Sequence, residues 1–88
     1  MDKEYILSFS SFYKAAYARD ILGEYGINSV LRKLPPELIR SCGTGLYLRT
    51  NSMQRPLEIF AEKEIVPRSI YMINHNSQND NGQRYSRV

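Results

Sequence analysis

Cys42 is the only cysteine in the 88-residue chain, and its surroundings suit chemistry better than those of any other residue. It lies between Ser41 and Gly43, and a second glycine follows at Gly45. Glycines beside a reactive atom let another molecule approach closely and expose backbone N–H groups. A cysteine is also often a small buried hydrophobe. The pattern alone therefore leaves two interpretations of Cys42 open, a reactive thiol and a buried side chain.

Other catalytic patterns are missing from the sequence. Without a second cysteine, Cys42 has no resolving partner for dithiol chemistry and no companion for a zinc site. The only histidine, His75, falls in a polar C-terminal stretch, so we do not expect it to serve Cys42 as a base. The two glycines at 43 and 45 are too few for a nucleotide-binding fingerprint. We therefore predict no metal site and no resident cofactor.

The composition is that of one soluble domain. Of the residues, 42% are hydrophobic and 24% are charged, and the chain is too short for two hydrophobic cores. No apolar run approaches the length of about 18 residues that a membrane span needs. The N-terminus shows no signal-peptide pattern, so we expect a cytoplasmic protein without a membrane partner. The net charge of +3 favours an anionic partner slightly but is low for a nucleic-acid-binding domain.

The spacing of apolar residues predicts four strands and two helices. Short runs rich in strand-forming residues predict strands at 5–9, 27–34, 46–49 and 69–73. A helix is expected over 12–25, with Ser10 or Ser11 as its N-cap and Gly26 as its stop. Its buried stripe is predicted to hold Ala15, Ala18, Leu22 and Tyr25. A second helix should begin between residues 52 and 56, and its buried stripe should consist of Leu57, Phe60 and Ala61.

This order of elements predicts an α+β fold, the ferredoxin-like βαββαβ sandwich. We expect a four-stranded antiparallel sheet of order 4-1-3-2 with both helices on one face. Three tyrosines, Tyr5, Tyr47 and Tyr71, are candidates for the open face, which a partner or the solvent must cover. A homodimer through that face or through an edge strand is one possibility, and RNA stacked on the tyrosines is a less favoured one.

The last fifteen residues differ from the rest of the chain. Residues 74–88 hold four Asn, two Gln, two Ser and one Gly, with almost nothing to bury. We therefore predict a single domain at residues 1–73 and a disordered, dispensable tail at 74–88.

The predicted topology brings the segment around Cys42 to the N-terminus of the first helix. The end of the first strand, the start of that helix and the start of the third strand all lie at one edge of the sheet. A helix N-terminus favours a thiolate, and Arg40 adds positive charge close by. On the same edge, Lys63 and Arg68 would attract an anionic donor or an acidic partner surface.

The alternative is that the loop folds inward. Cys42 would then pack against Leu38 and Ile39, and burial would raise the pKa of its thiol.

Residues 36–43, Pro-Glu-Leu-Ile-Arg-Ser-Cys-Gly, resemble a Pro-x-x-Ile-Ser-x-x-Cys-Gly type of motif. This motif occurs in a family of small bacterial domains described as selenium/sulfur (Se/S) carrier protein-like. The flanking helix end at 18–27 and the closing strand at 70–73 agree with that family, so the resemblance covers about residues 5–73. Arg40 departs from the pattern, since the family often has a small polar residue there.

The resemblance implies a sulfur or selenium carrier. Cys42 would hold sulfur or selenium as a transient persulfide or perselenide, received from a donor protein and passed to an acceptor protein. Such a chain is a covalent carrier rather than a turnover enzyme. The supporting residues would be Ser41, Gly43, Gly45, Ser10, Ser11 and Arg40. The alternative function is a non-catalytic binding or assembly module, for a metabolite or a protein, in which Cys42 is structural.

Overall fold

The computed structural model describes residues 3–39, 43–75 and 83–88. Strands and helices alternate along the chain as a βαββαββ series with a short 3-10 turn before the third strand. The elements, in chain order, are β1 (Lys3–Ser8), α1 (Phe12–Glu24), β2 (Ser29–Lys33), η1 (Pro36–Leu38), β3 (Thr44–Thr50), α2 (Gln54–Glu62), β4 (Ser69–His75) and β5 (Gln83–Arg87).

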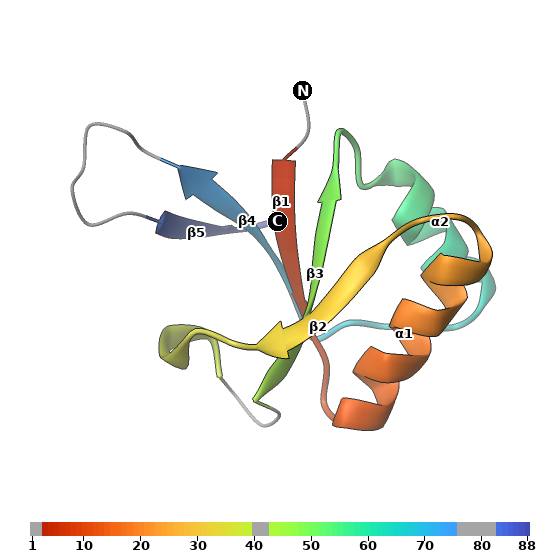
Figure 1. The fold of residues 1–88 in the computed structure, drawn as a ribbon, viewed down its shortest axis with the longest axis horizontal. Helices are drawn as coiled ribbons and strands as arrows, with labels where there is room; N and C mark the ends of the chain where they lie inside the picture. The colour runs from red at the N-terminus through yellow and green to blue at the C-terminus, as the bar shows by residue number, and fades with distance from the viewer. Residues whose placement is uncertain (1–2, 40–42, 76–82) are drawn as a thin grey trace.

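The strands form one antiparallel sheet of order β2-β3-β1-β4-β5. The first strand, β1, is central and pairs with β3 from Lys3↔Thr50 to Ser8↔Gly45. Both helices lie on the same side of the sheet (Figure 1). The first four strands therefore take the expected relative order, with β3 between β1 and β2.

The predicted number of four strands is wrong, because β5 adds a fifth strand beside β4. This strand comes from the stretch that the sequence analysis assigned to a disordered tail; residues 76–82 of that stretch lie outside the described residues. An edge strand is held mainly by backbone hydrogen bonds, which composition does not reveal. Val88 extends the pairing, since its N–H donates to the carbonyl oxygen of Ile70 at 2.8 Å.

The helix α1 begins at Phe12 as the sequence predicts and ends at Glu24, one residue earlier than predicted. The Ser11 side chain accepts a hydrogen bond from the Lys14 N–H at 3.3 Å, which caps the first turn. Gly26 adopts the left-handed conformation (φ 78°) that ends the helix. Tyr25 does not belong to the buried stripe: it is 36% exposed, and Arg55 lies 5.4 Å above its ring. The side chains that α1 buries are Ala15, Ala18, Ile21 and Leu22.

The buried stripe of α2 differs from the predicted one. Phe60 is buried as expected, but Ala61 is exposed and Leu57 is 39% exposed. The helix starts at Gln54, and Pro56, Ile59 and Phe60 form its buried face at i, i+3 and i+4 spacing. Phe60 meets Phe9 edge to face, with ring centroids 6.4 Å apart.

The sheet face away from the helices carries a second hydrophobic cluster. The segment after β2 covers this face, burying Leu34 and Leu38 against Ile6 and Tyr71. Tyr47 and Tyr85 pack at its border, and Ile73 completes it. The expected open face is thus largely closed by the chain itself.

The prediction of Tyr5 on that face is wrong. Side chains alternate along β1, so Tyr5 and Leu7 point toward the helices while Ile6 points to the second cluster. Tyr47 and Tyr71 do lie on the face away from the helices. Among the described residues, no helix is long and apolar enough to span a membrane.

Candidate functional site

The predicted carrier residue, Cys42, lies outside the described residues together with Arg40 and Ser41. The structure describes the chain on both sides of them, up to Ile39 and again from Gly43. The candidate site is therefore described through Ile39 and Gly43 and through the strand ends and the helix end that lie near them.

Four chain segments meet at the edge of the sheet where β3 begins. The last pair of the β1–β3 ladder is Ser8↔Gly45. The N–H of Leu34, just after β2, donates to the carbonyl oxygen of Gly43 at 2.8 Å. The N–H of Arg68, just before β4, donates to the carbonyl oxygen of Ser8 at 2.7 Å. The flank of Cys42 thus lies at the sheet edge that the topology predicts.

The N-terminus of α1 opens at this same edge. Ser10 follows Ser8 by two residues, and Gly43 precedes Gly45 by two residues. Both therefore lie just past the Ser8↔Gly45 pair that ends the β1–β3 ladder. Ser10 is exposed, whereas Ser11 is engaged as the cap of the helix. The first turn of α1 contains no acidic side chain, so no carboxylate there neutralises the partial positive charge of the helix N-terminus.

The two glycines near Cys42 have different surroundings. Gly43 is exposed, and a Cβ added to it would meet nothing within 4 Å. Gly45 is buried, and a Cβ there would overlap the end of the Leu34 side chain and lie 3.0 Å from Leu34 Cγ. Gly43 therefore leaves room for another molecule, while Gly45 serves the packing of Leu34.

The segment that leads to Cys42 is anchored to the sheet. Leu38 is only 6% exposed because it packs into the second cluster, and its N–H donates to the carbonyl oxygen of Pro35 at 2.9 Å. Ile39, the last described residue before the gap, is 39% exposed. Leu38, against which the alternative interpretation would pack Cys42, is therefore already covered by other residues of the second cluster.

Basic side chains surround this edge. Lys14, Lys33 and Arg68 are exposed, and each lies near one of the segment ends described above. Lys63 is also exposed and caps the end of α2. Lys63 and Arg68, which we expected to attract an anionic donor or an acidic partner surface, are thus both on the surface. Arg68 also makes an interaction within the chain.

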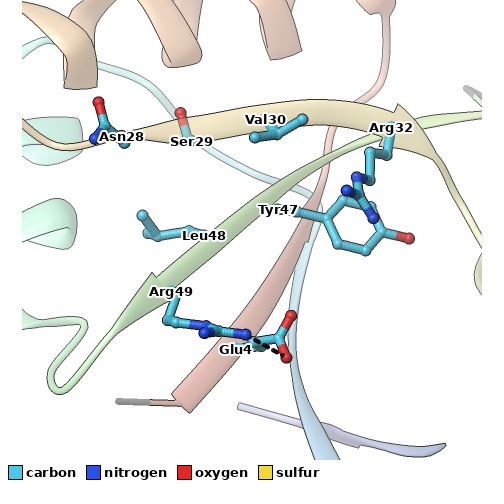
Figure 2. Close-up of a pocket in the computed structure, with 8 residues that line it drawn as sticks. All are labelled: Glu4, Asn28, Ser29, Val30, Arg32, Tyr47, Leu48 and Arg49. Carbon is cyan, nitrogen blue, oxygen red and sulfur yellow. Dashed lines mark ion pairs between the residues drawn. The ribbon is translucent and has the colours of Figure 1, made fainter.

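A separate hollow of about 260 Å³ lies across β2, β3 and β1, away from the helices (Figure 2). Arg32 lies over the ring of Tyr47 at 5.7 Å, and Arg49 pairs with Glu4 at 3.2 Å. The Tyr47 hydroxyl donates to the carbonyl oxygen of Lys33 at 3.1 Å. Burial raises the pKa of Tyr47, and so does the neighbouring Tyr85, while Arg32 acts in the opposite direction.

This hollow was not predicted from the sequence, although a signal for it is present there. Alternation along a strand puts Val30 and Arg32 on one face of β2, and it puts Tyr47 and Arg49 on the same face of β3. Because Tyr5 points to the helices and Tyr71 is covered, the three tyrosines do not share one exposed surface. Among the described residues, no group of three or more side chains suited to a metal ion lies together.

Comparison with models of protein families finds one family that matches most of the chain. The family model described as "Putative Se/S carrier protein-like" matches residues 4–72 of the 88. The chain belongs to this family, as the residues around Cys42 suggested. A search of curated proteins and a search of solved structures give no match. The matched span includes Cys42, runs from β1 into β4 and ends before β5.

Proposed function

We propose that this protein carries sulfur or selenium on Cys42 between a donor protein and an acceptor protein. The observation that carries the proposal is the family match over residues 4–72, which includes the only thiol of the chain. The geometry of the flanks supports it. Gly43 is exposed and open, and it lies at the same sheet edge as the N-terminus of α1, whose first turn holds no acidic side chain.

The transfer is a thiol exchange that needs no external oxidant. The Cys42 thiolate attacks the outer sulfur of a persulfide on the donor protein. The S–S bond of the donor breaks, the donor leaves as a thiolate, and a new S–S bond forms on Cys42. Loading with selenium from a perselenide follows the same balance. The acceptor protein then takes the outer atom and returns Cys42 to the thiolate.

The positive end of α1 favours the charged form of a nearby thiol. We therefore propose that the pKa of Cys42 lies below its ordinary value of about 8.5. Arg40, Ser41 and Ser10 would support the bound anion. A reducing compartment keeps such a thiol free, so we propose that the exchange takes place in the cytoplasm.

Intact-mass spectrometry tests the proposal directly. The full chain is incubated with a cysteine desulfurase and cysteine, and the mass should rise by one sulfur atom and fall back after a reductant is added. Cys42→Ser should show no gain. If the wild-type chain gains no sulfur, selenocysteine with the same desulfurase, which releases selenium as an enzyme-bound perselenide, is the second arm of the test. Failure of both arms would contradict the carrier function.

The pH dependence of alkylation tests the state of the thiol. The rate of iodoacetamide modification should rise with pH and level off with an apparent pKa below about 8.5. A higher apparent pKa, or reaction only after unfolding, would indicate a structural cysteine. The protein would then be a binding or assembly module, the alternative that the sequence left open.

A further inference from the structure

The strand β2 is an unprotected edge of the sheet. It stands at one end of the strand order and pairs with β3 on one side only. Within residues 3–39, 43–75 and 83–88, no other strand pairs with its outer side. Val30, next to its central residue Leu31, is 51% exposed. An edge of this kind presents unpaired N–H and C=O groups that can pair with another strand.

Hollows flank β2 on both faces of the sheet. On the face away from the helices lies the hollow of Figure 2, of about 260 Å³, which Val30 and Arg32 border. On the helix face, a second hollow of about 400 Å³ separates the C-terminal half of α1 from the start of β2. A strand added along β2 would send alternate side chains to these two faces, and each face has room for them.

The hollow on the helix face suits a cation. Asp20 and Glu24 line it together with Arg19, which pairs with Asp20 at 3.1 Å, and Glu24 has no ion pair among the described residues. Glu24 lies in the last turn of α1, which contains no basic residue, so the negative end of the helix dipole adds to its charge. Ser29 lines the same hollow, and its buried Oγ has no hydrogen-bond partner among the described residues. An ammonium group would supply both a positive charge and hydrogen-bond donors there.

We propose that a second copy of this chain pairs with β2 in antiparallel fashion, about a two-fold axis at Leu31. This register uses all five residues of the strand. It places Lys33 of the second copy opposite Ser29, beside the carboxylates of the helix-face hollow. By the two-fold symmetry, each copy supplies one lysine and receives one, as an isologous interface requires.

The other side chains of β2 fit the same register. Arg32 of the second copy lies opposite Val30, so its methylene stem covers the exposed valine while its guanidinium remains in water. A register centred one residue later would instead place the two Arg32 side chains opposite each other, which is unfavourable. The face away from the helices is a weaker candidate for a homodimer, because Leu34 and Leu38 already cover much of it.

The oligomeric state in solution tests this proposal. Size-exclusion chromatography with light scattering over a range of concentrations should show a monomer–dimer equilibrium, and amide hydrogen exchange in β2 should slow as the dimer fills. All samples carry Cys42→Ser, which removes any disulfide-linked dimer and makes the result independent of the carrier function. A chain that remains monomeric at the highest concentration, with unprotected β2 amides, would overturn the proposal.

Point substitutions locate the interface. Val30→Lys places a lysine opposite Arg32 of the second copy twice per dimer, so the dissociation constant should rise about tenfold or more. Val66→Lys is the matched control, since Val66 is 81% exposed and lies outside β2, and it should change nothing. If Val30→Lys and Val66→Lys dimerise like the parent chain, the interface is elsewhere and the proposal is wrong.

A charge exchange tests the register. Lys33→Glu should weaken the dimer, because its new carboxylate faces Glu24 of the second copy. Glu24→Lys should weaken it as well. The double variant Lys33→Glu/Glu24→Lys should dimerise more tightly than either single variant. Single variants that weaken the dimer without recovery in the double variant would contradict the register centred on Leu31.

Discussion

The side chain of Leu34 fills the space that a Cβ on Gly45 would occupy. A Cβ there would overlap Leu34 Cδ2 and would lie 3.0 Å from Leu34 Cγ and 3.3 Å from Ile6 Cγ2. The same leucine donates its backbone N–H to the Gly43 carbonyl oxygen. Leu34, which precedes Cys42, is therefore linked to the chain that follows Cys42 in two ways. It donates a hydrogen bond at Gly43, and it packs against Gly45.

Gly45→Ala should destabilise the fold, because the added methyl group collides with buried side chains. We expect a loss of about 1–3 kcal/mol in the free energy of unfolding, measured by chemical denaturation. Gly43→Ala is the control, since a Cβ there meets nothing within 4 Å, and it should change stability by less than about 0.5 kcal/mol. In Gly45→Ala/Leu34→Ala the loss should be smaller than the sum of the two single losses. Additive losses would mean that the two residues do not interact.

Leu22→Ala and Phe60→Ala should each lower the free energy of unfolding by about 2–5 kcal/mol. Both side chains are almost fully buried in the cluster between the helices and the sheet. Leu57→Ala is the matched control on α2, because Leu57 is 39% exposed, and its effect should stay below about 1 kcal/mol. Equal losses for Leu57 and Phe60 would show that the register of α2 differs from the one described.

Removal of β5 should lower the melting temperature, contrary to the expectation from composition that residues 74–88 are dispensable. A chain ending at His75 loses the β4–β5 pairing and the contact of Tyr85 with the second cluster. A loss of about 1 kcal/mol shifts the midpoint of a domain of this size by about 4–8 °C. Tyr85→Ala in the full chain should give part of this shift. A truncated chain that melts with the full one would mean that β5 contributes nothing to stability.

Stability should decrease at alkaline pH because of Tyr47 and Tyr85. Burial raises the pKa of both hydroxyls above the ordinary value of 10.0, and for Tyr85 the charge of Glu37 adds to the effect. A group whose pKa is raised by folding stabilises the folded state fully below pH 10, and this contribution is lost as pH rises through the folded pKa. Ionisation of these two tyrosines should therefore leave the free energy of unfolding unchanged below pH 10 and lower it above pH 10. Tyr47→Phe/Tyr85→Phe should reduce that fall, and an unchanged slope would exclude these two residues as its cause.

The sequence predicted most of the fold because its main signals are local. Ser11 and Gly26 mark the two ends of α1 through capping geometry, and alternating short apolar runs mark the strands. The relative order of the first four strands follows from the handedness of the crossover connections. Long-range packing was less visible. The burial of Leu38 and Tyr85 on the second face depends on how a connection folds back over the sheet, which no local pattern encodes.

Of the candidate site, only the placement of its flanks can be compared with the sequence, and the roles of its residues stay predictions. Topology alone brings Ser10 and Gly43 to one edge of the sheet, and the structure agrees. The role of Gly45 was not foreseen, because it depends on the contact with Leu34 from another segment. The pairing of Arg49 with Glu4 likewise depends on the β1–β3 register, which a sequence read one strand at a time does not reveal.

The central position of β1 has a consequence for synthesis of the chain. The strand β1 leaves the ribosome before β3 and β4, which both pair with it, so its second edge stays unpaired until residues 69–72 have been made. Until then, Ile6 and Leu7 on its two faces have no completed cluster to enter. We therefore expect the sheet to form only after β4 has been synthesised, because the pairings of β1 join segments that are distant in the chain.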